Sequence, residues 1–462
     1  MKTRIIFILC FNLILCSSLV SQNIVNTFGT TGTFTIKDAS TTYFTLNQAD
    51  GTIRLSPTTA NSQRGAILLG TERFLHTYRN SSNLGFNTFL GINSGNFTMG
   101  SGQSINASMN TGVGFESLFS LTFGYRNSAF GYQSMRTNTQ GIENSAFGMQ
   151  ALFSNTTGSD NSAFGVFALS DNTTGSFNSA FGVSSLILNT SGTFNSAFGY
   201  SSLSSNTTGS NNSAFGNASL TINTTGLRNS AFGHFSLHVN TDGDDNSAFG
   251  HSSLLSNISG RGNSAYGYYS LRNSTGNNNT AIGDSSGRNI TTGSNNIAIG
   301  FNAIVPTPTG SNQIRMGNTA ITFAGIQVAW TVSSDRNLKS NIYNSDLGLS
   351  FINKLRPVSY SRINDESGNI EYGFIAQEVD EVLKNEQNVN NGIISVDSEG
   401  IYSLRYNDLL APMVKAIQEL KQENEELRSE IESMKTVEER LVMLEKIIQN
   451  NSDLKEVKLT EK

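Results

Sequence analysis

A hydroxyl, a carboxylate and an amine lie close together where a repetitive, almost uncharged part of the chain ends. The segment from Trp330 to Lys339 has the sequence W-T-V-S-S-D-R-N-L-K. Ser334 and Lys339 are five residues apart, so a turn that folds back would place the amine beside the hydroxyl. An amine that takes the proton from a serine makes that serine a nucleophile. The same residue types are common in polar linker turns, which is the structural alternative.

The charged region after this junction carries four motifs in a particular order. They are S-S-D-R-N-L-K-S-N-I from Ser333, L-R-P-V-S-Y from Leu355, Y-G-F-I-A-Q-E-V from Tyr372 and Y-N-D-L-L-A-P-M-V-K-A-I-Q-E-L-K from Tyr406. In this order and spacing they resemble the C-terminal intramolecular chaperone domain of endosialidases and phage tail spikes. That family of self-cleaving serine peptidases also occurs at the ends of bacterial surface fibres. The resemblance extends to Lys421.

The resemblance implies a function for the junction. Domains of this family trimerise, template the folding of the fibre before them, and then cut themselves off at the serine of an S-D-x-x-x-K motif. Carried over to this sequence, Ser334 is the nucleophile, Lys339 is its general base, and the peptide bond between Ser333 and Ser334 is the one that is cut.

The residue types of the C-terminal region agree with a lysine base. All four histidines lie upstream of the junction: His76, His234, His238 and His251. A lysine amine in water has a pKa of about 10.4, so it must lose water or lie near another cation before it can accept a proton. Arg336 could supply that cation. Asp335 would oppose the effect if it paired with Lys339, so we expect Asp335 to cap a turn instead, and backbone amides to stabilise the oxyanion.

The N-terminal residues have the pattern of a secretory signal peptide. Basic Lys2 and Arg4 precede the apolar run I-I-F-I-L-C-F-N-L-I-L-C, and a small polar stretch follows. The run is too short to span a membrane, so we expect residues 1–21 to be removed and the mature chain to be secreted or held at a bacterial cell surface. A lipoprotein acylated at Cys16 is the alternative, although Leu15 is large for that position.

The remaining composition excludes several kinds of site. Both cysteines, Cys10 and Cys16, lie within the predicted signal peptide, so the mature chain has no thiol. We expect neither a metal nor a cofactor, and no transmembrane segment in the mature chain. The formal net charge is −5 over 462 residues. Because no basic patch with interleaved aromatic residues occurs, we expect no nucleic-acid partner.

The middle of the chain repeats every 17 residues. N-S-A-F-G begins at Asn127, Asn144, Asn161, Asn178, Asn195, Asn212, Asn229 and Asn246. Related units begin at Asn110, Asn263, Asn279 and Asn296, with a single-residue slip before Asn279. The consensus is N-S-A-F-G-x-x-S-L-x-x-N-T-T-G-x-x. These twelve units in register predict a repeat architecture.

Such a short repeat cannot bury a core of its own, so its units must stack into a β-solenoid. At about 3.3 Å per residue a coil has a perimeter of roughly 56 Å, which predicts two short strands and two turns in a flattened roll. We expect Phe and Leu to fill the interior, and the glycines at the fifth and fifteenth positions to form corners with positive φ. Stacked asparagines should form hydrogen-bonded ladders along the axis.

The N-S-A-F-G and N-T-A-I-G units also resemble the head repeats of trimeric autotransporter adhesins, which form trimeric left-handed rolls. The resemblance implies a homotrimeric stalk, although the repeats of those adhesins are usually shorter. Turns and ladders of a roll need Asn, Thr and Gly for structural reasons, so these residues imply no ligand by themselves.

The repeats divide the chain into its predicted domains. In order these are a signal peptide (1–21), an N-terminal β cap or attachment region of short strands and hairpins (22–86), the β-roll repeats (87–300), a β neck (301–333), the self-cleaving intramolecular chaperone domain (334–412), a coiled coil (413–450) and a tail (451–462). The neck resumes a β pattern from Ile314 to Trp330, which we interpret as the region that brings three chains together.

Two helices are predicted after the junction. Apolar residues at helical spacing predict an amphipathic helix from Tyr372 to Glu386 that packs on the core. From Met413 the heptad positions predict a coiled coil with a phase shift near Val437. They hold Met413, Ile417, Leu420, Asn424, Leu427, Ile431, Met434 and Leu441, and then Leu444 and Ile448. Asn424 would set register and oligomer state. A single amphipathic helix packed on the domain is the alternative.

The sequence thus predicts a mostly β, homotrimeric fibre with a β-solenoid stalk, a small α+β chaperone domain and a coiled-coil helix. We expect an intramolecular, single-turnover serine endopeptidase that uses Ser334 and Lys339, supported by Asp335 and Arg336. One alternative is an adhesin whose C-terminal domain is a permanent trimerisation clamp. Another is a fibre that binds a cell-surface glycan or a host cell, for which the cut is only maturation.

Overall fold

The computed structural model describes residues 33–37, 42–47, 52–55, 66–78, 85–97, 99, 106–363, 365, 368–387 and 391–459. The predicted signal peptide, residues 1–21, lies outside these ranges. The chain divides into two compact units, Met1–Asp242 and Gly243–Lys462. Repeats of 17 residues occur in both units.

Short antiparallel strands occupy the described part of the N-terminal region. Three of them, β1 (Thr33–Lys37), β2 (Thr42–Asn47) and β3 (Ile53–Leu55), form one sheet. A hairpin of β4 (Ile67–Leu69) and β5 (Glu72–His76) follows, and β5 pairs antiparallel with β6 (Thr88–Leu90). These are the short strands and hairpins that the sequence predicted.

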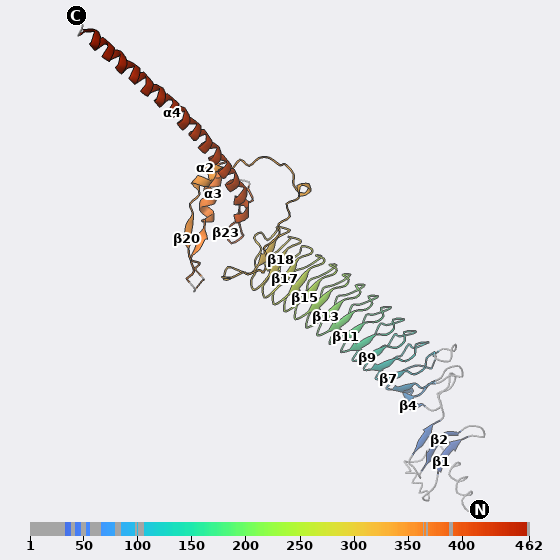
Figure 1. The fold of residues 1–462 in the computed structure, drawn as a ribbon. Helices are drawn as coiled ribbons and strands as arrows, with labels where there is room; N and C mark the ends of the chain where they lie inside the picture. Colours follow the sequence, from blue (N-terminus) through green and yellow to red (C-terminus); the bar gives the residue numbers. More distant parts are fainter. Residues whose placement is uncertain are drawn as a thin grey trace, which may run out of the picture. The chain divides into compact units, whose positions relative to one another are not determined.

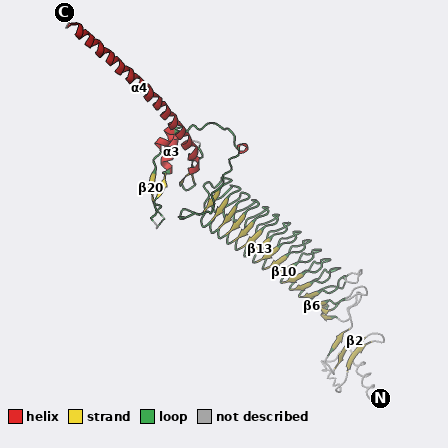
Figure 2. Cartoon of the chain, viewed as in Figure 1, coloured by secondary structure: helices red, strands yellow, loops and turns green. Residues whose placement is uncertain are grey.

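The repeats form a β-solenoid with one turn per 17 residues, as predicted. In the first unit β6 begins a parallel ladder that continues through β7 (Thr111–Val113), β8 (Ser128–Phe130), β9 (Ser145–Phe147), β10 (Ser162–Phe164), β11 (Ser179–Phe181), β12 (Ser196–Phe198), β13 (Ser213–Phe215) and β14 (Ser230–Phe232). Each residue pairs with its equivalent one repeat away, for example Ala163 with Ala180. Figure 1 shows the ladder, and Figure 2 shows that turns make up the rest of each coil. Each coil therefore has one strand, not the predicted two.

The interior of the solenoid differs from the prediction. In the turn that begins at Asn144, Ala146 and Leu152 are fully buried, whereas Phe147 is only half-buried. Side chains of a strand alternate between its two faces, so an inward alanine turns the flanking serine and phenylalanine outward. The prediction that Phe fills the interior is therefore wrong. The Phe rings stack outside on one another, with 4.7 Å between the centroids of Phe164 and Phe181.

The predicted asparagine ladders are confirmed. The first asparagine of each repeat donates to its equivalent in the turn before, for example Asn161 Nδ2 to Asn144 Oδ1 at 3.1 Å. A second ladder runs through the twelfth position, where Asn172 Nδ2 donates to Asn155 Oδ1 at 2.8 Å. Both columns are fully buried. Buried amides are costly without partners, so the ladders supply the hydrogen bonds that allow asparagine inside the coil.

The corner geometry was predicted only in part. Glycine at the fifth position has positive φ, as Gly165 shows with 144°. The fifteenth-position glycine does not, and it is needed for space instead: a Cβ on Gly175 would lie 2.4 Å from Asn172 Oδ1 and 2.5 Å from the Gly192 carbonyl oxygen. Other left-handed positions hold non-glycine residues, including Leu169 with φ of 52°.

In the second unit the ladder comprises β15 (Ser247–Phe249), β16 (Ser264–Tyr266), β17 (Thr280–Ile282), β18 (Ile297–Ile299) and β19 (Ile314–Met316). The strand β19 is the only one in the predicted neck, residues 301–333. The β pattern up to Trp330 was therefore overestimated for the single chain. Every residue from 319 to 344 is exposed, so no packed surface of the same chain holds this segment in a sheet.

A small α+β domain follows. It contains η1 (Arg336–Leu338), α2 (Leu349–Lys354), β20 (Val358–Tyr360), β21 (Glu371–Gly373), α3 (Ala376–Asn385), β22 (Ile394–Val396), β23 (Tyr402–Leu404) and η2 (Tyr406–Leu409). The strands form two antiparallel pairs, β20 with β21 and β22 with β23. The buried core consists of Leu347, Phe351, Val379, Leu383, Ile393 and Leu409.

The two predicted helices are present with different ends. The first, α3, begins at Ala376 because the chain from Glu371 to Gly373 pairs with β20, so the prediction of helix from Tyr372 is wrong there. The second, α4 (Leu410–Leu459), is continuous for 50 residues. The heptad phase shift near Val437 does not interrupt it. No described helix is apolar over a length that could cross a membrane.

Candidate functional site

The structure brings Ser334 and Lys339 together. Lys339 Nζ donates a hydrogen bond to Ser334 Oγ over 2.6 Å. The contact is possible because the chain between them forms the single 3-10 turn η1, after which the Lys339 amide donates to the Arg336 carbonyl at 3.1 Å. The turn between the two residues thus brings the amine to the hydroxyl, as the spacing of five residues suggested.

Asp335 shapes this turn. Its Oδ1 accepts a hydrogen bond from the Asn337 amide at 2.8 Å, which makes Asp335 the N-cap of η1. An N-cap acceptor satisfies an amide that the turn cannot pair itself. The carboxylate of Asp335 accepts from the backbone, as we expected of a cap, and the Lys339 amine donates to Ser334.

The environment of the pair is open. Ser333, Ser334, Arg336 and Lys339 are all exposed, and no described side chain covers them. A lysine amine surrounded by water holds its proton, whereas one withdrawn from water gives it up readily. In one chain, therefore, the geometry of a serine and lysine pair is present without the apolar cover that such a pair needs.

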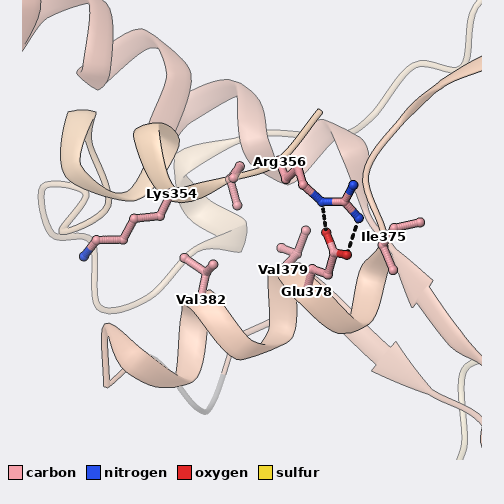
Figure 3. A pocket seen from close by; sticks show the side chains of 7 residues that line it. Lys354, Arg356, Ile375, Glu378, Val379 and Val382 are labelled. Atoms are coloured by element: carbon pink, nitrogen blue, oxygen red, sulfur yellow. Dashed lines mark hydrogen bonds and ion pairs between the residues drawn. The ribbon is translucent and has the colours of Figure 1, made fainter. Parts of the chain in front are cut away.

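Ser334 and Lys339 do not line the pocket that lies between α2 and α3. A pocket of about 140 Å³ between α2 and α3 is lined by Leu355, Ile375, Val379 and Val382 together with an ion pair of Arg356 and Glu378 (Figure 3). Arg356 Nε lies 3.0 Å from Glu378 Oε2, and the guanidinium contact lowers the pKa of this carboxyl. A pocket of this volume has room for about one side chain, and the ion pair links Arg356 to the first turn of α3. We therefore interpret the pocket as a gap in the packing of the domain and not as a ligand site.

The motifs that carry the family resemblance meet inside the domain. Phe374 N donates to Tyr406 Oη at 3.1 Å, joining the motif from Tyr372 to the motif from Tyr406. A Cβ on Gly373 would lie 2.2 Å from that hydroxyl oxygen, so a larger residue would require the Tyr406 side chain to move. The contact links residues 32 positions apart in two motifs, and the spacing of the motifs did not predict it.

A second long-range contact positions the start of the domain. Glu419 of α4 accepts a hydrogen bond from the Leu349 amide at 2.6 Å, which caps α2 and lowers the pKa of the Glu419 carboxyl. Lys415 Nζ donates to the Ser345 carbonyl oxygen at 2.7 Å. Both α4 residues contact the segment that follows Lys339, at Leu349 and Ser345. The heptad pattern predicted only a coiled coil for these residues, because a cap that joins residues 70 positions apart leaves no local pattern in the sequence.

Comparison with known protein families gives a match that covers part of the C-terminal domain. Residues 334–387 match the model of the family described as chaperone of endosialidase. No curated protein and no solved structure matches the chain. The protein is thus of the tail-fibre type, with a β-solenoid stalk and a C-terminal chaperone domain. That domain belongs to the endosialidase chaperone family, as its motifs indicated. The match begins at Ser334, the first residue after the predicted cut.

The family match does not extend to individual roles. The assignments of Ser334 as nucleophile, Lys339 as base and Ser333–Ser334 as the cut remain predictions, as do the supporting roles of Asp335 and Arg336. Among the described residues there is no group of three or more His, Asp, Glu or Cys side chains that could hold a metal ion.

Proposed function

We propose that this protein is a secreted or cell-surface homotrimeric fibre whose C-terminal domain drives assembly and then releases itself by cutting the Ser333–Ser334 bond. The observation that carries the proposal is the 2.6 Å contact between Ser334 Oγ and Lys339 Nζ at the first residue of a self-cleaving chaperone family.

The chemistry begins when neutral Lys339 takes the proton of the Ser334 hydroxyl. Ser334 Oγ attacks the carbonyl carbon of Ser333, and the C–N bond to Ser334 breaks, leaving an ester between the two residues. The departing Ser334 amine receives the proton from Lys339. One water molecule then hydrolyses the ester, which yields a carboxylate on Ser333 and restores the Ser334 hydroxyl.

Assembly supplies the cover that one chain lacks. A second and third copy would withdraw Lys339 from water, so the cut would wait until the domain has trimerised. This order suits a chaperone, because it keeps the domain attached until the stalks have met.

The long helix α4 supports assembly through a coiled coil. Its heptad residues are exposed in the single chain, with Ile417 at 65% and Leu427 at 56% of their accessible surface. A row of exposed apolar residues over several heptads is stable in water only when other helices cover it. This favours the coiled coil over a helix packed on its own domain.

One face of the solenoid supports a trimer rather than a glycan site. Along the first unit, the second, fourth and sixth repeat positions from Ser128 to His234 contain no Asp, Glu, Lys or Arg. The Phe rings of this face are nearly parallel, 5° apart between Phe164 and Phe181, so each ring covers the face of the next. A sugar stacks on ring faces, and within the Phe column only ring edges are free. A second solenoid has the same spacing of rings and can bury every edge.

The proposal is tested by the masses of purified variants. Full-length protein, 49.8 kDa before processing, should separate into two fragments, the shorter beginning at Ser334. Ser334→Ala should stay intact, while Ser333→Ala keeps the nucleophile and should still be cut. Lys339→Arg should stay intact too, because guanidinium keeps its proton.

Two outcomes would contradict the assignment. Normal cleavage by Lys339→Arg would exclude Lys339 as the base, and loss of cleavage only in Ser333→Ala would move the nucleophile by one residue. Leu427→Pro, which breaks α4, tests the dependence on assembly and should leave full-length chains. If wild-type trimers are never cut, the C-terminal domain is a permanent clamp.

A further inference from the structure

The segment between the last strand of the solenoid and Ser333 has the pattern of a strand but no sheet. Apolar residues alternate with small or polar ones from Ile326 to Val332, which places Ile326, Val328, Trp330 and Val332 on one face. Ile321 and Phe323 continue the alternation on the other side of Ala324 and Gly325, where a glycine allows a bulge. All six are exposed, from 52% for Ile321 to 85% for Phe323.

This segment carries no charge. From Met316 to Ser334 the chain contains no Asp, Glu, Lys or Arg. Loops that remain in water are usually polar, and edge strands in water usually carry charges that prevent pairing. An alternating, uncharged and exposed segment of this kind is therefore expected to pair outside its own chain.

The position of the cut limits which partner is possible. A cut after Ser333 leaves this segment on the stalk. The core of the chaperone domain, from Leu347 to Leu409, is closed without it. The stalk, in contrast, ends at β19, the edge strand of its sheet, where Ile314 and Met316 are 65% and 60% exposed. The apolar surface that needs cover is thus continuous on the stalk side of the cut.

We propose that residues 321–332 form an intermolecular strand that meets the same segment of the other two copies, with Ile326, Val328, Trp330 and Val332 facing the threefold axis. The inference rests on the proposed trimer and cut. Symmetry brings identical residues of the three copies to one level along the axis, so each apolar residue forms a layer with its two equivalents.

The proposed strand explains why the cut lies directly after this segment. Before the cut, the coiled coil holds the three chains together. After the cut the chaperone leaves, and the three stalks remain joined at their C-terminal ends by these layers. The fibre then keeps its trimer without the helix that assembled it, and its apolar end is not exposed to water.

Cysteine crosslinking tests the strand, because the mature chain has no thiol of its own. Val328→Cys should form disulfide-linked dimers of chains upon mild oxidation, since equivalent residues meet near the axis. Ala329→Cys, the adjacent residue on the opposite face, is the matched control and should crosslink at least tenfold less. Both variants are made with the wild-type serine and with Ser334→Ala, so that the result is obtained whether or not the chain is cut.

The outcomes separate this inference from the proposed function. Equal crosslinking of Val328→Cys and Ala329→Cys in trimers would show a loop without a buried face and would overturn the strand. A second outcome would also overturn the strand: neither cysteine variant crosslinks, and the chaperone domain stays bound to the stalk after the cut. The segment would then dock on the chaperone domain, for example in the pocket of about 520 Å³ lined by Pro357, Tyr372, Phe374 and Tyr406. Absence of the cut alone bears only on the proposed function.

A charge substitution gives an independent measure after the cut. Val328→Glu would place three carboxylates together at the axis, so trimers of the released stalk should dissociate on gel filtration at a lower urea concentration than wild-type trimers. Ala329→Glu adds the same charge on the outer face and should leave that concentration unchanged. Equal dissociation of the two variants would contradict the proposal.

Discussion

A histidine at the start of the solenoid is buried in its neutral form. The His76 ring lies 4.8 Å from Phe89 and 4.7 Å from Phe97, and its Nε2 donates to the Ser94 carbonyl oxygen at 2.8 Å. Burial lowers the pKa of His76 to about 4, and Arg73 adds to the effect. Among described atoms Nδ1 has no partner, so a second proton would be buried without an acceptor.

The first prediction concerns acid. Because the unfolded chain binds a proton at His76 near pH 6.5 and the folded chain only near pH 4, folding around β5 and β6 should weaken as pH falls through this window, by about 3 kcal/mol near pH 4. Hydrogen exchange over residues 72–97, corrected for intrinsic rate, should show this opening. His76→Gln keeps a donor for Ser94 and should show little pH dependence. A wild-type response equal to that of the variant would refute the burial argument.

At the same scale, the sequence identified the proximity of Ser334 and Lys339 but not what produces it. Five residues can close a turn, and this much follows from chain geometry. The contribution of Asp335 was expected as a cap, because Asp prefers that position. The cover that we propose for the pair could not be predicted from one chain, because in that proposal it comes from other copies.

Among the elements, the solenoid turn shows where pattern and structure diverge. The period of 17 predicted the fold, since repeats of this length must stack. It did not say which side of the strand faces inward. Alanine at the third position faces inward and phenylalanine at the fourth lies outside, a choice that the hydrophobic pattern of the repeat does not encode. Left-handed leucines such as Leu169 were also missed, because single-residue preferences favour glycine there.

The second prediction concerns the glycine at the fifteenth position. Gly175→Ala should destabilise the stalk by about 1–3 kcal/mol, because the new methyl group would contact Asn172 and Gly192 within a column of identical close approaches. Thr174→Ala, the exposed neighbour in the same turn, is the control and should change little. Urea unfolding of the purified protein, followed by circular dichroism, measures both. Equal midpoints for the two variants would mean that the column relaxes without cost.

At the scale of the whole molecule, the order of the domains followed from sequence because each has its own signature. The repeat marks the stalk, four spaced motifs mark the chaperone and a heptad pattern marks α4. The neck was less predictable: it has a β pattern but only β19 is a strand in the single chain. In the assembly that we propose, the partner strands of this segment come from the other two copies, so a single chain shows the pattern without the sheet.

The third prediction separates folding from stability. Within a stalk, strands pair only 17 residues apart, so each chain can form coils quickly, but the register between chains depends on distant contacts and is slow to find. A chain that ends at Ser333 should therefore expose its Phe face and residues 321–332 and aggregate. The stalk cut from full-length protein has the same sequence and should remain a soluble trimer. Gel filtration of the two preparations at equal concentration makes the comparison. If the truncated chain forms soluble trimers unaided, the C-terminal domain is not a chaperone for this stalk. If the cut stalk also aggregates, the domain is a permanent clamp whose removal destroys the fibre.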